Sequence, residues 1–181
     1  MKGIIFNLLE DFAVEAAGEE KFEEILSKCN LKTKEPFVGP GSYPDGDLSE
    51  IVDKASKLLG IEKLELIRKF GRFAFAGLAE KFPVFVEGKT AHEFIKSIND
   101  IHFIEVKKLY EDANPPRFEY EEISPDKMIL YYRSERKLCP LIMGIIEGIS
   151  DYYKTPIEVK KVKCMLDGAP ECVFELNFGK S

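Results

Sequence analysis

The sequence predicts an α+β fold, in which a helical N-terminal lobe packs on a C-terminal lobe that holds an antiparallel sheet and helices. Apolar residues recur at helical spacing through the first part of the chain, consecutive prolines then end this pattern, and alternating segments typical of strands follow. We expect one domain over residues 1–181, because no internal repeat or low-complexity linker divides the chain. Its helical part covers about 1–112 and its α+β part about 113–181.

In the helical part, the apolar spacing predicts helices over residues 4–15, 20–29, 62–81 and 90–111. Another helix is expected after the loop at residues 36–46, which is rich in Gly and Pro. Asp47 stands directly before the apolar positions of that helix, and aspartate is a favoured capping residue. We therefore expect Asp47 to be its N-cap.

Asn114, Pro115 and Pro116 mark the boundary between the two parts, since consecutive prolines cannot continue a helix and hold the preceding residue extended. Residues 117–123 and 128–134 are predicted to be strands joined by a turn at 124–127, and a helix over about 137–153 follows. The last elements are expected to form a second hairpin, with strands at 157–164 and 172–178 and a turn at 167–170.

The composition excludes several classes of protein. The net charge of −6 argues against nucleic acid as the main partner, because phosphate binding needs a basic face. No apolar run approaches the roughly 20 residues that cross a bilayer, and the first residues lack the pattern of a signal peptide. We expect a soluble cytoplasmic protein without a membrane partner, whose four cysteines are free thiols or metal ligands.

The two histidines differ in their surroundings. His102 lies on a helical stripe of apolar residues, namely Ile95, Ile98, Val106 and Leu109. An imidazole on such a face needs a partner, so His102 is either a ligand or a core histidine bonded to a backbone carbonyl. His92 falls on the polar side of the same helix and is expected on the surface.

A second polar group occurs where the second strand is expected to end. Tyr132, Ser134 and Arg136 would face the same side of a strand and would offer hydrogen-bond donors to carboxylates or a phosphate. The alternative is the polar outer face of an edge strand. The opposite face is no more apolar, so polarity alone does not show which face is buried.

The spacing Tyr132-x-Ser134-x-Arg136 resembles the Y-x-S-x-R motif of H-NOX domains, the haem sensors related to the haem domain of soluble guanylate cyclase. Residues 1–5, 70–71, 100–102 and 115–117 also resemble family positions, in the family's order and over essentially the whole chain. The resemblance implies a haem between the two lobes, with His102 as the proximal iron ligand and Pro116 against the macrocycle. Tyr132, Ser134 and Arg136 would bind the haem propionates. A Cys-x-x-Cys-His sequence does not occur, so the haem is expected to be non-covalent haem b.

The resemblance also bears on the gas. Oxygen-binding members of the family carry a distal tyrosine, and the corresponding residue here is Leu141. The other expected pocket positions are apolar, namely Ile5, Leu9, Ala74, Leu78 and Ile145. We therefore predict binding of nitric oxide (NO) and CO with little stable O₂ binding, which sets aside an oxygen carrier or sensor.

The family mechanism implies that NO weakens the bond between the iron and His102 and so frees the helix around residues 90–111. The signal would then pass to a separate protein, such as a histidine kinase or a cyclic-di-nucleotide enzyme.

Three cysteines form a separate candidate metal site. Cys164 and Cys172 stand symmetrically about Gly168, so the predicted hairpin would bring them together, and Cys139 begins the preceding helix. This resembles a subset of H-NOX proteins that bind zinc through three cysteines and one histidine. The histidine position is occupied by Lys161, so a fourth ligand would have to be water, a carboxylate such as Asp167 or Glu171, or a partner's residue. A Cys164–Cys172 disulfide and plain thiols are the alternatives.

The sequence does not predict an enzyme, because no nucleophile–base pair, Gly-rich phosphate loop or carboxylate cluster stands out. The rival interpretation is a thiol- or zinc-based redox sensor, or a small-ligand-binding module, without haem. The pattern around Cys164, Gly168, Cys172 and Phe174 also resembles small ligand-binding modules of the vinyl-reductase type. Stoichiometric haem separates the two interpretations.

Overall fold

The computed structural model describes residues 1–106 and 114–179 and confirms the α+β class. The helices are α1 (Gly3–Ala17), α2 (Glu19–Ser27), α3 (Asp45–Leu59), α4 (Lys63–Lys81), α5 (Ala91–Asp100) and α7 (Cys139–Tyr152). The strands are β1 (Arg117–Ser124), β2 (Lys127–Arg133), β3 (Ile157–Lys163) and β4 (Cys172–Phe178). Short 3₁₀ turns cover Pro83–Phe85 and Met165–Asp167.

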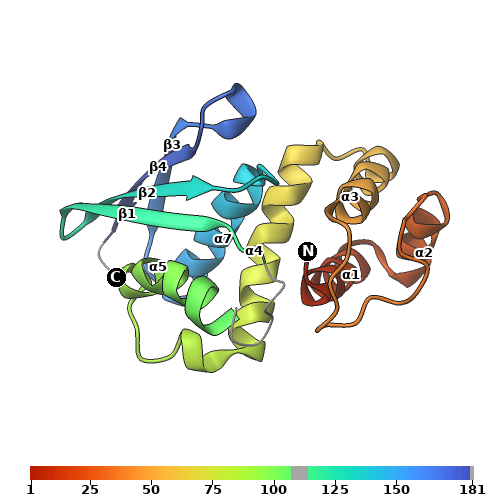
Figure 1. The fold of residues 1–181 in the computed structure, drawn as a ribbon, viewed down its shortest axis with the longest axis horizontal. Helices are drawn as coiled ribbons and strands as arrows, with labels where there is room; N and C mark the ends of the chain where they lie inside the picture. The colour runs from red at the N-terminus through yellow and green to blue at the C-terminus, as the bar shows by residue number, and fades with distance from the viewer. Residues whose placement is uncertain (107–113, 180–181) are drawn as a thin grey trace.

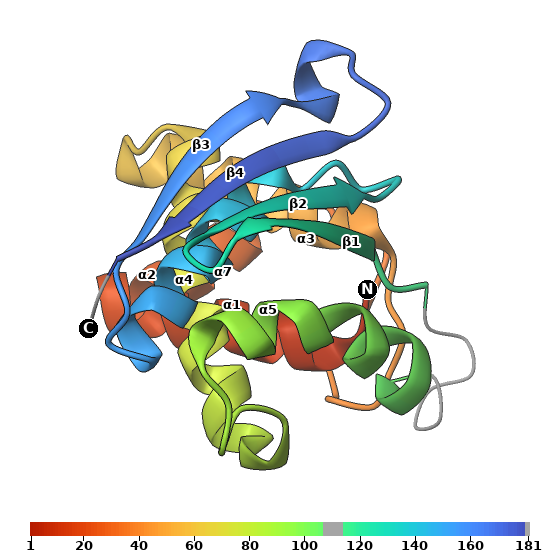
Figure 2. The same cartoon turned by 90° about the vertical axis from the view of Figure 1, so that its left-hand side faces the viewer.

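The four strands form one antiparallel sheet in the order β1-β2-β4-β3. α1, α2 and α3 lie at the end of the molecule remote from this sheet, and α4 and α7 stand between them (Figure 1). α5 and α7 share one buried core with the sheet, so both cover the same sheet face (Figure 2). A second core joins α1, α2, α3 and α4.

The contact between α4 and α7 depends on glycines. A Cβ at Gly144 of α7 would collide with the backbone carbonyl of Arg68, and one at Gly71 of α4 would collide with that of Leu141. The two helices therefore approach backbone to backbone. The ion pairs Arg68–Glu147 and Arg72–Asp151 join the same helices along their exposed side.

The start of α3 differs from the prediction. The helix begins at Asp45 with Pro44 as its N-cap, so Asp47 lies in the first turn. Its buried carboxylate instead accepts hydrogen bonds from the backbone N–H of Lys32 (2.8 Å) and of Thr33 (2.9 Å), and from the Thr33 hydroxyl (2.6 Å). Burial opposes ionisation, but these hydrogen bonds outweigh it and hold the pKa of Asp47 below its usual range.

The predicted helix over 90–111 is also corrected. The α-helix ends at Asp100, and a π-helix continues from Ile101 to Val106. Thr90 caps the start of α5, and Glu93 completes a capping box. The predicted position of Leu109 lies outside the described residues.

In the part of the chain that the structure describes, no helix is long and apolar enough to span a membrane.

Candidate functional site

His102 lies in the π-helical segment after α5. Its ring stacks on Phe118 of β1, with 5.7 Å between the ring centroids and 20° between the planes. Burial lowers the pKa of His102 to about 4, so the imidazole is neutral at physiological pH. Its buried Nδ1 has no hydrogen-bond partner among the described residues. The expectation of a core histidine satisfied by a carbonyl therefore fails for this nitrogen.

The strand that carries Tyr132 is internal to the sheet, so the edge-strand alternative is wrong. Tyr132 itself is buried, and its ring packs against Phe118, with centroids 5.4 Å apart. Phe118 thus contacts both Tyr132 and His102. Burial raises the pKa of Tyr132 to about 12, and hydrogen bonds to Ser134 and to the backbone of Leu138 oppose that rise.

β2 ends at Arg133, so the alternation of a strand does not extend to Ser134 and Arg136. Local hydrogen bonds bring the three motif residues together instead. Ser134 bonds to Tyr132, and the Arg136 backbone N–H donates to Ser134 Oγ at 3.3 Å. The predicted alternation along a strand is therefore wrong for Ser134 and Arg136, although a turn keeps the three residues next to one another.

Arg136 binds a carboxylate of this chain. Its Nε lies 2.9 Å from Asp45 Oδ2 at the start of α3, and its Nη1 donates to the Asn114 carbonyl at 2.7 Å. The other oxygen of Asp45 accepts from the amino group of Met1 at 2.7 Å. Partial burial opposes ionisation of Asp45, but these two cations outweigh it and lower its pKa. The sequence offered no signal for this contact between lobes.

The apolar positions expected around the gas lie where α1, α4 and α7 meet. Ile5, Leu9, Ala74, Leu78 and Leu141 belong to the second core, and Ile145 packs against the first. Their side chains contain no hydrogen-bond donor. Pro116, half-buried, directly precedes β1, two residues after the carbonyl that binds Arg136.

The three cysteines form a buried cluster. The Sγ atoms of Cys139, Cys164 and Cys172 lie within 4.8 Å of one another, which confirms the predicted proximity. The thiols are free, so the disulfide alternative is not realised. Burial and the neighbouring thiols raise the pKa of Cys139, and burial likewise raises that of Cys172, whose Sγ accepts from the Met165 backbone N–H at 3.3 Å.

The fourth ligand position differs from the zinc-binding pattern. Lys161 is exposed, and its Nζ lies 3.8 Å from Asp167 Oδ2. Among the described residues, the group of possible ligands at this place holds the three cysteines and no histidine or carboxylate. Asp167 and Glu171 therefore do not complete the cluster in this structure.

His92 is less exposed than predicted. Its side chain is 21% exposed, its Nε2 lies 3.4 Å from Glu122 Oε1, and its ring meets the edge of Phe178 at 5.0 Å between centroids. The polar side of α5 thus packs against the sheet rather than facing only solvent.

Known proteins resemble this chain over most of its length. The soluble guanylate cyclase gcy-37 of Caenorhabditis elegans is 25% identical over 155 residues, which are 83% of this chain and 22% of the cyclase. The chain thus spans about a fifth of the length of that relative.

The solved H-NOX protein from S. oneidensis in its Fe(II)NO state has a TM-score of 0.93 at 29% identity, covering 99% of this chain and 100% of that one. A mutant of the S. oneidensis protein in the Fe(II) state has a TM-score of 0.92 at 30% identity, covering 100% and 97%. The model of the Haem-NO-binding family (HNOB) matches residues 2–161. The chain therefore belongs to the Haem-NO-binding family, whose members are haem-binding sensor domains rather than enzymes.

Proposed function

We propose that this chain is a haem-based NO sensor, which binds NO and CO at ferrous haem, forms little stable O₂ complex and signals to a separate protein. The observation that carries the proposal is a half-buried, neutral His102 whose Nδ1 is buried and lacks a partner among the described residues, and whose ring contacts Phe118, which in turn contacts Tyr132. A histidine in this state is suited to hold a metal, because a metal ligand must be neutral imidazole.

The residues present fit a haem. His102 would hold the iron, and Ser134 and Arg136 would meet the propionates together with the Tyr132 hydroxyl. Arg136 already binds one carboxylate, Asp45, so its position and chemistry suit a second. Haem, when bound, would supply a ferrous iron as the binding site for NO, with His102 as the protein's ligand to it. Pro116 would contact the macrocycle beside the start of β1.

The apolar side chains on α1, α4 and α7 support the gas preference. O₂ bound to ferrous haem carries partial negative charge and depends on a hydrogen-bond donor, whereas NO binds without one. Leu141 and Ile5 have no donor to offer. The S. oneidensis protein has been solved with NO and with CO bound, in agreement with this preference.

The response would begin at His102, which lies in a π-helix rather than in an α-helix. Such segments are rare and are often found at functional sites. Release of His102 would remove a restraint on residues 101–106 and let the helical lobe shift relative to the sheet lobe. The ligand would thereby bias two states of the domain. The proposed receiver is a histidine kinase or a cyclic-di-nucleotide enzyme, in the cytoplasm.

The ultraviolet–visible spectrum of the purified protein tests the proposal. We expect the Soret band of five-coordinate ferrous haem, unchanged in air and shifted by NO. A stable O₂ spectrum would contradict the argument from Leu141. Absence of a Soret band after haem reconstitution would reject the sensor and favour the haem-free module.

The coupling step has its own test. His102→Gly, with imidazole added to occupy the iron, should still bind NO but should lose the NO-induced change in hydrogen exchange across residues 101–106. The wild-type protein with the same imidazole is the control. An NO response that persists in the variant would show that the signal does not pass through His102.

We also propose a zinc ion at Cys139, Cys164 and Cys172, which three buried thiols within 4.8 Å of one another support. Zinc prefers four ligands, so water or a partner's residue would complete the site. Stoichiometric zinc is expected in the reduced protein, retained in Cys29→Ser and lost in Cys172→Ser. Zinc well below stoichiometry in the reduced wild type would reject this site and leave a cluster of plain thiols.

A further inference from the structure

The cluster of Cys139, Cys164 and Cys172 draws its three sulfurs from three different elements. Cys139 is the first residue of α7, Cys164 stands directly before the 3₁₀ turn at Met165–Asp167, and Cys172 begins β4. Their Sγ atoms lie within 4.8 Å of one another. Two sulfurs bound to one ion at about 2.3 Å, as in zinc–thiolate sites, stand less than about 4.6 Å apart. The cluster therefore has close to the spacing that a single thiophilic ion needs.

The surroundings of the cluster supply three ligands and not four. The three cysteines are at most 2% exposed, so solvent has little access to them. Among the described residues, no histidine or carboxylate joins the group, and the side chain of Lys161 pairs with Asp167 instead. Zinc, which prefers four ligands, would need the additional ligand named above. An ion that takes three sulfurs would find its set complete.

The charge of the bound complex favours the same kind of ion. The cluster belongs to the apolar core that the sheet shares with α5 and α7. A divalent zinc ion on three thiolates leaves one negative charge, and burial of an unpaired charge is costly. Trivalent arsenic on three thiolates is neutral, and a lone pair occupies the fourth corner of its coordination pyramid. Both the number of ligands and the absence of net charge thus suit trivalent arsenic.

We propose that Cys139, Cys164 and Cys172 form a binding site for trivalent arsenic, taken up as arsenous acid, As(OH)₃, and held by three sulfurs alone. Each thiol proton leaves with one hydroxyl group of the acid, so three As–S bonds replace three As–O bonds and three water molecules are released. Neither arsenic nor sulfur changes its oxidation state, so the step needs no oxidant or reductant. The inference goes beyond gas sensing and does not depend on haem.

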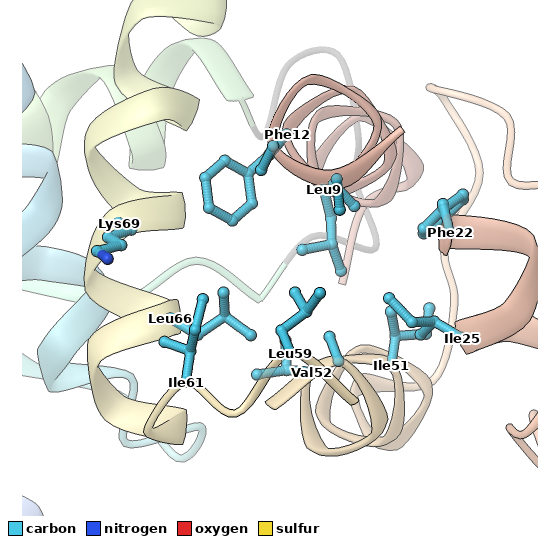
Figure 3. Close-up of a pocket in the computed structure, with 14 residues that line it drawn as sticks. Leu9, Phe12, Phe22, Ile25, Ile51, Val52, Leu59, Ile61, Leu66 and Lys69 are labelled. Atoms are coloured by element: carbon cyan, nitrogen blue, oxygen red, sulfur yellow. The ribbon is translucent and has the colours of Figure 1, made fainter. Parts of the chain in front are cut away.

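The fourth cysteine, Cys29, provides a matched control in the other lobe. Its Sγ donates to the Ile25 carbonyl at 3.2 Å, and Ile25 lines an apolar cavity between the four N-terminal helices (Figure 3). Cys29 is not part of the group of sulfurs that could share an ion. Cys29→Ser therefore removes a thiol and leaves the cluster intact, whereas Cys164→Ser removes one of its three ligands.

Arsenite titration of the reduced protein, read as arsenic content after desalting, tests the site. The reductant should be a phosphine, because dithiol reductants bind trivalent arsenic themselves. One arsenic per chain is expected in wild type and in Cys29→Ser, and it should survive equimolar dithiothreitol, which offers only two sulfurs. Cys164→Ser should bind arsenic at least tenfold more weakly and should lose it to dithiothreitol. Arsenic well below one per wild-type chain, or equal retention in Cys164→Ser, would overturn the inference.

X-ray absorption at the arsenic edge tests the coordination in the wild-type protein alone, and so covers the case in which Cys164→Ser does not fold. Three As–S bonds and no As–O bond are expected. Two sulfurs and one oxygen would overturn the inference, because the third thiol would then not be a ligand.

Zinc content, measured on the same samples, separates the two metal proposals. One arsenic per chain in protein that holds no zinc supports the arsenic site and rejects the zinc ion. Zinc that arsenite does not displace rejects the arsenic site and keeps the zinc ion. The Soret band is read separately, so neither result decides the sensor function.

Discussion

Lowering the pH from 7 to 5 should destabilise the haem-free protein through His102. Burial lowers the pKa of this imidazole from 6.5 to about 4. Between these values the unfolded chain binds a proton that the folded chain does not, so stability falls as the pH falls. The full shift corresponds to about 3 kcal/mol, and about 2 kcal/mol of it is lost between pH 7 and pH 5.

Urea denaturation at both pH values measures this loss, and His102→Leu is the matched variant because leucine does not titrate. Asp45 and Asp47 also have lowered pKa values, but such carboxylates lose their contribution only as the pH falls through the acid range. They remain in both proteins and cancel in the comparison. Wild type should thus lose about 2 kcal/mol more than the variant. Equal losses would show that His102 is not a desolvated neutral imidazole and would remove the observation that carries the proposed function.

Other substitutions test the packing and the contact between lobes. Gly144→Ala should lower the free energy of unfolding by about 2 kcal/mol. The overpacked contact with the α4 backbone costs about 1–3 kcal/mol, and the higher helix propensity of alanine returns at most about 1 kcal/mol. Thermal melts of Gly144→Ala and of the control Gly46→Ala measure this cost. Gly46→Ala should be neutral or stabilising, because the space around its added Cβ is open, and a similar loss of stability in both variants would reject the close helix contact. Asp47→Asn should cost about 2 kcal/mol, because a buried carboxylate loses charge-assisted hydrogen bonds from two backbone N–H groups and a hydroxyl, and a urea midpoint within error of wild type would contradict this. Asp45→Asn should cost less than about 1 kcal/mol, because the Asp45 carboxylate is half-exposed, yet it should slow haem loss by freeing Arg136 for the propionates. Haem transfer to an acceptor protein at an unchanged rate would show that the Asp45 carboxylate and the haem propionates do not compete for Arg136.

Local patterns in the sequence predicted the helices and strands. The features that sequence analysis missed depend mostly on contacts between residues distant in the sequence. Helical spacing identified α4, and consecutive prolines marked the start of the sheet lobe. The symmetric placement of Cys164 and Cys172 about a turn predicted their proximity correctly. Apolar spacing does not distinguish a π-helix from the end of an α-helix, since both keep the same face buried over one turn, so the change at Ile101 was missed.

The missed partners were of a different kind. Asp47 has the residue type and position of an N-cap, but its carboxylate bonds a loop that lies 14 residues earlier in the sequence. Asp45, two residues away, binds Arg136 from the other lobe. Nothing in the local pattern separates these two aspartates, because their roles depend on which donors the fold brings near them. Phe118 escaped notice for the same reason, since an aromatic residue in a predicted strand gives no indication that it touches both His102 and Tyr132.

The arrangement of contacts between lobes limits how a signal could travel. α4 and α7 meet backbone to backbone at glycines and are joined by two arginine–carboxylate pairs, so a sliding motion between them would break packing and charge contacts together. The contact between Arg136 and Asp45 is different, because it is a single ion pair whose carboxylate is half-exposed and involves no close approach of two backbones. In the proposed response, release of His102 would act on residues 101–106, and Arg136 also binds the carbonyl of Asn114, which lies just before β1. Under this proposal, a change in position of Asn114 would be passed by the Arg136 guanidinium to Asp45 of α3 without disturbing the α4–α7 contact.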